Sequence, residues 1–196
     1  MPRPKQRTPE LRSRLLSVAL ELLAREGAAG FTTRSIAREA DTSPPAVYEL
    51  FGDKGGLVRE VFFEGFRLLG EELRGVGTSA DPLADLLAVL EAYRRFIREH
   101  TVLAEVMFSR PFTDFEPGAG EIEASSSVRR LIVARVDRCI DEGLLGGEAT
   151  DVAHVLVALT QGLAAAEAAR RLGTSEESVE RRWALAMRAV TDGLHP

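Results

Sequence analysis

The chain has 196 residues, of which 45% are hydrophobic, so it can bury one ordinary core or a small and a medium one. Its net charge of −5 argues against a protein that coats nucleic acid with positive charge over its whole surface. Cys139 is the single cysteine, which excludes an intrachain disulfide and favours a reducing compartment, so we expect a cytoplasmic protein.

The first sixty residues are more basic than the rest of the chain. Their net charge is +2, whereas the remaining residues carry −7. A basic arm at the extreme N-terminus fits contacts with DNA phosphates or with a minor groove, and a flexible tail without a role is the alternative. The arm carries Arg3, Lys5, Arg7, Arg12 and Arg14 against Glu10.

The first expected helix starts near Pro9, with Thr8 as its cap, and stops near Gly27. Apolar residues recur along it at helical spacing and predict one buried face. These residues are Leu11, Leu15, Ala19, Leu22 and Leu23.

Residues 33–51 carry the pattern of a helix-turn-helix. Either Thr32 or Thr33 can cap its first helix. This helix has an apolar face with small alanine side chains, which let a second helix cross closely. Asp41 stands where the chain must turn sharply, and aspartate tolerates a left-handed backbone better than most residues. The apolar face consists of Ile36, Ala37 and Ala40.

Ser43 is placed to cap the second of these helices, whose first residue is Pro44, a position that needs no N–H. Val47, Leu50 and Phe51 then turn inward. The outward positions are Pro44, Pro45, Ala46, Tyr48 and Glu49.

The rest of the chain also has helical period, and no stretch favours a strand. Residues 110–127 hold prolines, glycines and three serines and are expected to form a long loop. The predicted fold is therefore all-α, with about nine helices: a helix-turn-helix domain over residues 1–54 and a second helical domain over residues 55–196. The helices expected after the helix-turn-helix cover residues 57–73, 83–100, 102–108, 128–143, 152–172 and 175–194.

The last two helices indicate an interface. Residues 152–166 are apolar nearly all round, which means that more than one side is covered, but they are too short and too rich in Gly, His, Thr and Gln for a membrane span. The final helix has a regular apolar stripe from Val179 to Leu194. A homodimer is expected, and burial within a larger monomeric bundle is the alternative.

The segment FTTRSIAREADTSPPAVYELFGDKGGLV resembles the N-terminal DNA-binding signature of the TetR family of one-component transcriptional regulators. Two departures stand out, since the family usually has glycine and a branched apolar residue where this chain has Asp41 and Thr42. The family often places a Lys or Gln at the start of the recognition helix, where Pro44 offers neither a charge nor a hydrogen bond to a base. The matching elements are Phe31-Thr32-Thr33, Ile36-Ala37, Ala40, Ser43, Val47-Tyr48, Phe51 and Lys54.

The resemblance implies contacts with double-stranded DNA. The Tyr48 hydroxyl and the Lys54 ammonium are suited to phosphate, and the resemblance adds Thr33, for which a pure helix cap is the alternative role. Arg34 can read a guanine edge unless it is only solvated, and Glu49 can accept from cytosine N4 unless it is a solvated carboxylate. Apolar contacts to thymine methyl groups are expected from Pro44, Pro45 and Ala46.

The family also implies a small-molecule inducer bound in the C-terminal half. Aromatic and sulfur-containing side chains with a few polar groups are the usual lining of such a site, although plain core packing explains each of them equally well. The candidates are Phe96, His100, Met107, Phe108, Phe112, Gln161 and Trp183.

We expect no enzyme, no cofactor and no metal site, because the sequence has no phosphate loop, nucleotide fingerprint or metal-ligand spacing. The function expected is that of a sequence-specific DNA-binding regulator, most often a repressor in this family, released from a palindromic operator by a small molecule. The alternatives are a helical protein-interaction module and an adaptor that needs no ligand.

Overall fold

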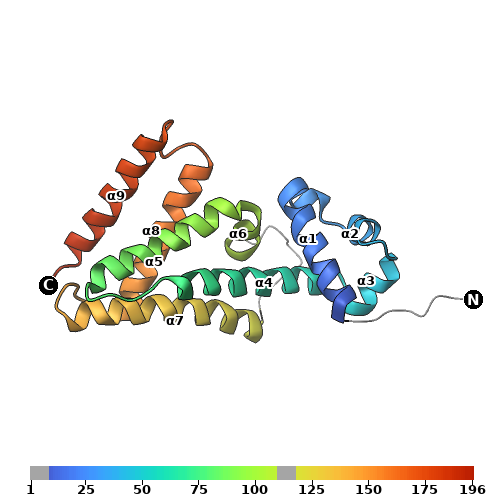
Figure 1. Cartoon of the computed structure of the whole chain (residues 1–196), viewed down its shortest axis with the longest axis horizontal. Coiled ribbons are helices and arrows are strands. Elements are labelled where there is room, and N and C mark those ends of the chain that lie inside the picture. Colours follow the sequence, from blue (N-terminus) through green and yellow to red (C-terminus); the bar gives the residue numbers. More distant parts are fainter. Residues whose placement is uncertain (1–8, 110–117) are drawn as a thin grey trace, which may run out of the picture. The chain divides into compact units, whose positions relative to one another are not determined.

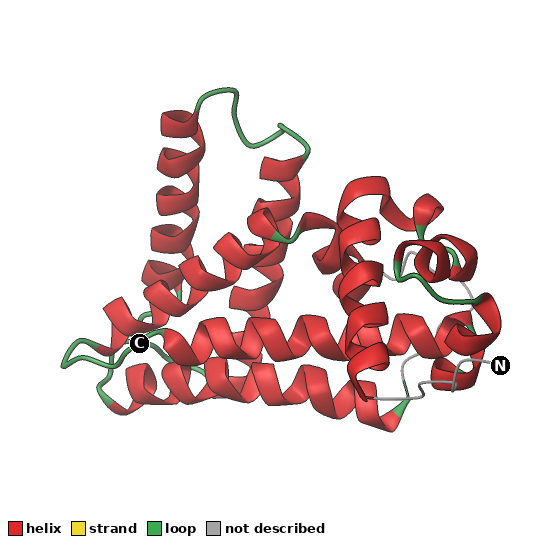
Figure 2. Ribbon diagram, turned by 45° about the vertical axis from the view of Figure 1, so that its right-hand side comes forward, coloured by secondary structure: helices red, strands yellow, loops and turns green. Residues whose placement is uncertain are grey.

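A computed structural model describes residues 9–109 and 118–196 of the chain. Within these ranges the regular structure consists of nine helices and contains no strand (Figure 2). The prediction of an all-α fold with about nine helices is confirmed.

The helices, labelled in Figure 1, belong to two compact units. The first unit contains α1 (Pro9–Gly30), α2 (Thr33–Glu39), α3 (Pro44–Phe51), the first part of α4 (Lys54–Gly75) and α6 (Thr101–Phe108). The second contains the rest of α4, α5 (Pro82–Glu99), most of α7 (Ala119–Asp141), α8 (Ala149–Ala168) and α9 (Glu176–Gly193). The units divide α4 after Phe66, and the domain boundary after residue 54 stays a prediction.

Helix α1 forms the core of the first unit with α2 and α6, which both lie against it. All five residues of its predicted apolar stripe are buried. Gly27 adopts φ 66°, a left-handed value, so the regular helix breaks near the predicted end although helical turns continue to Gly30.

Helix α6 packs closely on α4 within the first unit because Gly65 lacks a side chain. A Cβ at Gly65 would lie 2.5 Å from Sδ of Met107. Phe108 also meets α4, with its ring edge-on to Phe66 at 5.9 Å between centroids. This contact fixes where α6 lies along α4.

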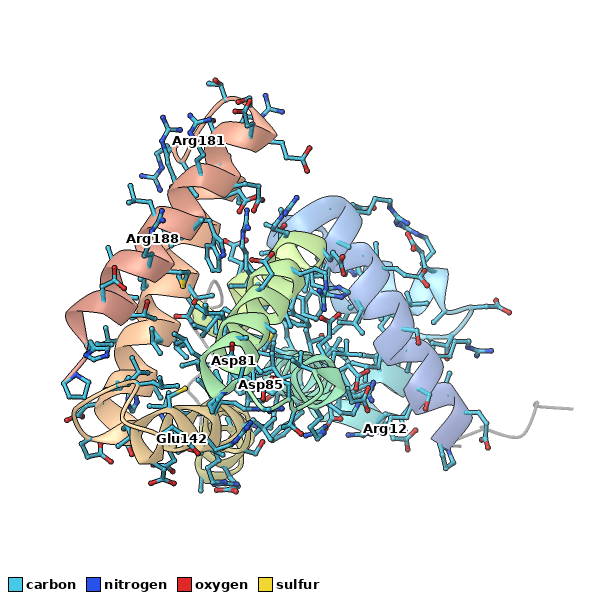
Figure 3. The ribbon with its side chains drawn as sticks, turned by 60° about the vertical axis from the view of Figure 1, so that its left-hand side comes forward. Arg12, Asp81, Asp85, Glu142, Arg181 and Arg188 are labelled. Carbon is cyan, nitrogen blue, oxygen red and sulfur yellow. The ribbon has the colours of Figure 1, made fainter. Side chains whose placement is uncertain are left out.

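In the second unit, Asp85 fixes the start of α5 (Figure 3). Its buried carboxylate accepts hydrogen bonds from the backbone N–H of Ser79 at 2.8 Å and from Nη1 of Arg138 on α7 at 2.8 Å. The Ser79 N–H is the main reason that the pKa of Asp85 falls to about 2, and Arg138 adds to it. Asp85 therefore stays charged and ties α5 to α7.

Arg94 is fully buried and joins three helices of the second unit. From α5 it donates to Glu167 of α8 at 2.9 Å and to Glu180 of α9 at 2.7 Å, and its guanidinium lies 4.6 Å from the ring centroid of Trp183. Burial lowers the pKa of Arg94, but hydrogen bonds to these carboxylates outweigh burial and raise it. The charge is thus kept inside the core by its partners.

The predicted loop over residues 110–127 was wrong in its second half, because α7 already begins at Ala119. Glu121 explains the early start: it is buried, accepts the N–H of Gly118 at 2.9 Å and is ion-paired with Arg59. A carboxylate in the first turn satisfies free N–H groups and favours the helix dipole. Residues 110–117 lie outside the described residues.

Candidate nucleic-acid interface

The turn between α2 and α3 has the geometry that the sequence predicted. Asp41 has φ 49°, and its N–H donates to the carbonyl of Arg38 at 3.3 Å. The N–H of Thr42 donates to the carbonyl of Ala37 at 2.9 Å, which completes the hydrogen-bond pair of a Schellman motif. This motif normally has glycine at the left-handed position, so Asp41 fills it at a cost in backbone strain.

Helix α3 buries one face and exposes the other. Val47 and Phe51 are buried, whereas the Tyr48 side chain is exposed, with 48% of its surface accessible. Pro44, Pro45 and Ala46 are at least partly accessible at the start of the helix. Ser43 occupies the cap position, but its side chain makes no capping hydrogen bond, so that part of the prediction was wrong.

Two predicted phosphate contacts lie side by side on the helix-turn-helix. The hydroxyls of Thr33 on α2 and Tyr48 on α3 are 3.2 Å apart and share a hydrogen bond. Thr32, rather than Thr33, caps α2, because its Oγ1 accepts the N–H of Ser35 at 3.1 Å. The Thr33 hydroxyl is therefore free from the capping role that was its alternative explanation.

Lys54 is the first residue of α4 and is exposed, as is Arg34 in the first turn of α2. Asp53 accepts the N–H of Gly56 at 2.7 Å and so caps α4 directly before Lys54. Gly56 permits the tight passage from α3, since a Cβ there would lie 1.8 Å from the carbonyl oxygen of Phe51. Local caps thus fix the backbone that carries Lys54.

Arg12 has a structural role that the sequence analysis missed, since it was counted with the basic arm (Figure 3). Its Nη1 donates to the carbonyl of Leu50 at 2.8 Å, and its Nη2 is 2.6 Å from Glu60 of α4. The guanidinium also lies 4.8 Å from the ring centroid of Phe51. We call Arg12, Leu50, Phe51 and Glu60 the Arg12 clamp, which joins α1, the end of α3 and α4.

A signal for this role existed in the sequence. Arg12 directly follows Leu11 at the edge of the buried stripe of α1, where a long side chain can cross onto a neighbouring helix. Arg14 is exposed and has no polar partner in the described part of the chain. The other basic residues of the arm, Arg3, Lys5 and Arg7, lie outside the described residues.

The predicted ligand residues of the first unit belong to α6 and its start. His100 is the residue before α6, and its side chain makes no capping hydrogen bond. Met107 is buried against Gly65, and Phe108 packs on Phe66. Phe112 lies outside the described residues.

In the second unit the predicted ligand residues take part in packing. Phe96 is fully buried, and Trp183 lies beneath the guanidinium of Arg94. Gln161 donates its amide N–H to the hydroxyl of Tyr93 at 2.8 Å. Burial raises the pKa of Tyr93, and the Gln161 hydrogen bond opposes this, so the phenol is neutral. Their part in ligand binding stays a prediction.

The described residues contain no group of three or more His, Cys, Asp or Glu that could hold a metal ion. Cys139 is buried, and burial raises the pKa of its thiol, which disfavours the reactive thiolate.

Two family models match the chain in succession. Residues 15–61 match "Bacterial regulatory proteins, tetR family", and residues 86–190, more than half of the chain, match "Tetracyclin repressor-like, C-terminal domain". No curated protein matches this chain.

Solved structures are similar to the chain over nearly its whole length. A protein of unknown function from Rhodococcus sp. RHA1 is 26% identical with a TM-score of 0.83, covering 99% of this chain and 100% of that one. The TetR family transcriptional regulator PfmR from Thermus thermophilus is 18% identical with a TM-score of 0.70, covering 93% and 100%. A tetR family regulatory protein from Rhodococcus RHA1 is 20% identical with a TM-score of 0.71, covering 93% and 98%.

Proposed function

We propose that this chain, which belongs to the TetR family of bacterial regulators, is a repressor. It binds a palindromic operator as a homodimer and leaves the operator when a small molecule binds. Members of this family are DNA-binding transcriptional regulators, and so is this chain. The observation that carries the proposal is the exposed hydroxyl pair of Thr33 and Tyr48 on the helix-turn-helix.

The hydroxyl pair supports phosphate binding because the two groups already constrain each other. A Tyr48 hydroxyl held by Thr33 loses less conformational freedom when it donates a hydrogen bond to a phosphate oxygen. Lys54 adds a positive charge at the start of α4. These contacts set register and affinity, while base edges set the choice of sequence.

Base contacts are proposed for the exposed residues around the start of α3 and α2. Arg34 is exposed and has the donor geometry for a guanine edge. Pro44, Pro45 and Ala46 offer only apolar contact, which fits the methyl groups of thymine.

Helices α8 and α9 support the homodimer. Both carry exposed large apolar residues, with Val155 of α8 50% accessible and Leu185 of α9 59% accessible. By length and composition α8 could also cross a bilayer, with a mean hydropathy of 1.3 over its most apolar 18 residues, a third of which are buried. We attribute this apolar surface to a second copy of the chain in the cytoplasm, because the family consists of DNA-binding regulators.

The operator is tested by selecting bound sequences from randomised duplex DNA. We expect a two-fold palindrome whose half-sites are one helical turn apart, about 34–36 Å, or somewhat more. A pool that shows no palindrome at moderate salt would contradict the proposal. Binding that is insensitive to salt would instead favour a helical protein-interaction module.

A further inference from the structure

The second unit contains a cavity of about 370 Å³ that none of the predicted ligand residues lines. Its walls come from the end of α4, from α5 and from α7. Its volume lies at the lower end of the range of small-molecule sites, which is roughly 300–1,000 Å³. We call it the arginine cavity, lined by Leu73, Arg74, Val89, Ser127, Arg130, Leu131, Ala134 and Arg135.

The lining combines an apolar wall with three positive charges. Leu73, Val89 and Leu131 supply most of the apolar surface, and Ala134 continues it. The three arginines bring like charges to one small space, and none of the lining residues is acidic. An anion with an apolar body would be attracted by these guanidinium groups and would cover the apolar wall.

Arg135 retains unused hydrogen-bonding capacity. Its Nη2 donates to the carbonyl of Val76 at 2.9 Å, but its Nη1 is buried without a hydrogen-bond partner in the described part of the chain. The carboxylate of Asp85 is 3.7 Å from Nη1, which is an ion-pair distance but too long for a hydrogen bond. This buried nitrogen is therefore stabilised by the charge of Asp85 and not by a hydrogen bond, and the part of Arg135 that lines the cavity contributes its positive charge.

The other two arginines are more accessible to a ligand. Arg74 is exposed and makes no hydrogen bond or ion pair within the ranges that the structure describes. Arg130 pairs with Glu123 at 2.6 Å, but both side chains are more than half exposed, so the pair is weak and exchangeable.

We propose that the arginine cavity binds an amphipathic carboxylate, with its apolar body against the leucines and Val89 and its carboxylate at the guanidinium groups. Guanidinium binds carboxylate through paired hydrogen bonds, which an uncharged head group cannot reproduce. This names a class of ligand for the small-molecule control proposed above. Binding of the carboxylate does not depend on that control, and only its effect on DNA rests on the proposed function.

Calorimetric titration of the full chain without DNA tests the site, with octanoate, octan-1-ol and acetate as probes. We expect octanoate to bind about tenfold or more tightly than octan-1-ol, which lacks the charge, and than acetate, which lacks the apolar body. Equal affinities for octanoate and octan-1-ol would overturn the proposal.

Single substitutions locate the bound carboxylate. Arg74→Met should weaken octanoate binding about tenfold, the scale of one charge-assisted hydrogen bond, and leave octan-1-ol unaffected. Arg67→Met is the matched control, because Arg67 lies two turns earlier on α4, is exposed and does not line the cavity. An equal effect of both substitutions would refute the site. Since Arg74 has no partner among the described residues, its replacement should leave the fold intact, which circular dichroism checks.

The effect on DNA is measured separately. Octanoate that binds at the arginine cavity and also lowers operator affinity supports both proposals. Octanoate that binds but leaves operator affinity unchanged supports the cavity and contradicts ligand control through it. No octanoate binding, with normal operator binding, contradicts the cavity alone.

Discussion

Asp41 shows how one residue sets the geometry and the stability of the helix-turn-helix. Its left-handed φ was predicted from the type of residue and its place, because a turn between two crossing helices needs such a backbone. Aspartate accepts this conformation less readily than glycine does. The turn at Asp41 therefore carries a small backbone strain, which a substitution can remove.

We expect Asp41→Gly to raise the free energy of unfolding by roughly 0.5–1 kcal/mol, since glycine reaches positive φ without a steric penalty. Asp41→Ala should lower it by a similar amount, because alanine adopts a left-handed backbone less readily than aspartate does. Urea unfolding of both variants gives the comparison. A destabilised glycine variant would mean that the aspartate side chain, rather than the backbone, is what the turn requires.

Lys54 and Tyr48 are both proposed to contact phosphate, but only Lys54 does so with a charge. Lys54→Ala should flatten the dependence of log K on log salt by about one unit, because one fewer counterion is released. Tyr48→Phe should weaken binding about tenfold, as loss of one hydrogen bond to a charged group does, without changing that slope.

Operator affinities at several salt concentrations measure both effects. The Tyr48→Phe variant is the control for the slope, because it removes a neutral contact from the same surface. If Lys54→Ala left the slope as it was, Lys54 would not contact phosphate. Arg67→Ala provides the second comparison, since Arg67 is exposed on α4 outside the helix-turn-helix, and the slope for this variant should match that of the natural chain.

At the scale of elements, the sequence predicted most helices but not the polar contacts between them. Periodicity identified the buried stripe of α1 because apolar spacing is a local property. Arg94 and Arg95 are neighbours in sequence, yet Arg94 is fully buried and the Arg95 side chain is 51% exposed. The partners of Arg94 on α8 and α9 lie far along the chain, so no local pattern distinguishes the two.

In the candidate DNA-binding site, too, the sequence predicted the local features but not the contacts between helices. The exposure of Tyr48 and the place of Lys54 were confirmed, since both depend on helix phase and caps. The roles of Thr32 and Thr33 were left open, because either hydroxyl can cap α2 and only three-dimensional packing brings Thr33 to Tyr48. The place of Arg12 beside the buried stripe of α1 was visible in the sequence, but its acceptor, the carbonyl of Leu50, has no sequence signature, so the contact itself was missed.

The hydrogen bonds of Asp85 make the second unit sensitive to acid. Because the pKa of Asp85 is lowered from 3.8 to about 2 in the folded state, its stabilising contribution is present above pH 4 and is lost as the pH falls toward 2. Asp85→Asn should lower the Tm at pH 7, and its Tm should approach that of the natural chain near pH 2. Thermal unfolding from pH 7 to pH 2 measures this.

The matched control is Asp141→Asn, which removes one exposed carboxylate from the end of α7. Its Tm should stay close to that of the natural chain at pH 7. Parallel Tm curves for Asp85→Asn and the natural chain down to pH 2 would show that the Asp85 carboxylate does not contribute through its charge.

At the scale of the whole molecule, α8 and α9 predict assembly. The sequence indicated an interface because α8 is apolar on more sides than one helical bundle can cover. Val155 and Leu185 remain exposed in the described structure, and large exposed apolar patches mark surfaces that bind a partner.

Val155→Glu should therefore weaken the homodimer by about a hundredfold or more, since each interface would bury two unpaired carboxylates. Sedimentation velocity over a range of concentrations measures the loss. Ile122→Glu is the control, because Ile122 is an equally exposed apolar residue, at 58%, but lies on α7. If Val155→Glu and Ile122→Glu sediment alike, the interface lies elsewhere.

The Arg12 clamp has a consequence for how a signal would arrive. The guanidinium of Arg12 contacts both the last turn of α3 and the second turn of α4, so these two turns are joined through one side chain. A small shift of this part of α4 would therefore move the end of α3 with it. If the proposed small molecule acts by moving α4, replacing Arg12 would therefore weaken its effect on operator binding more than it weakens operator binding itself.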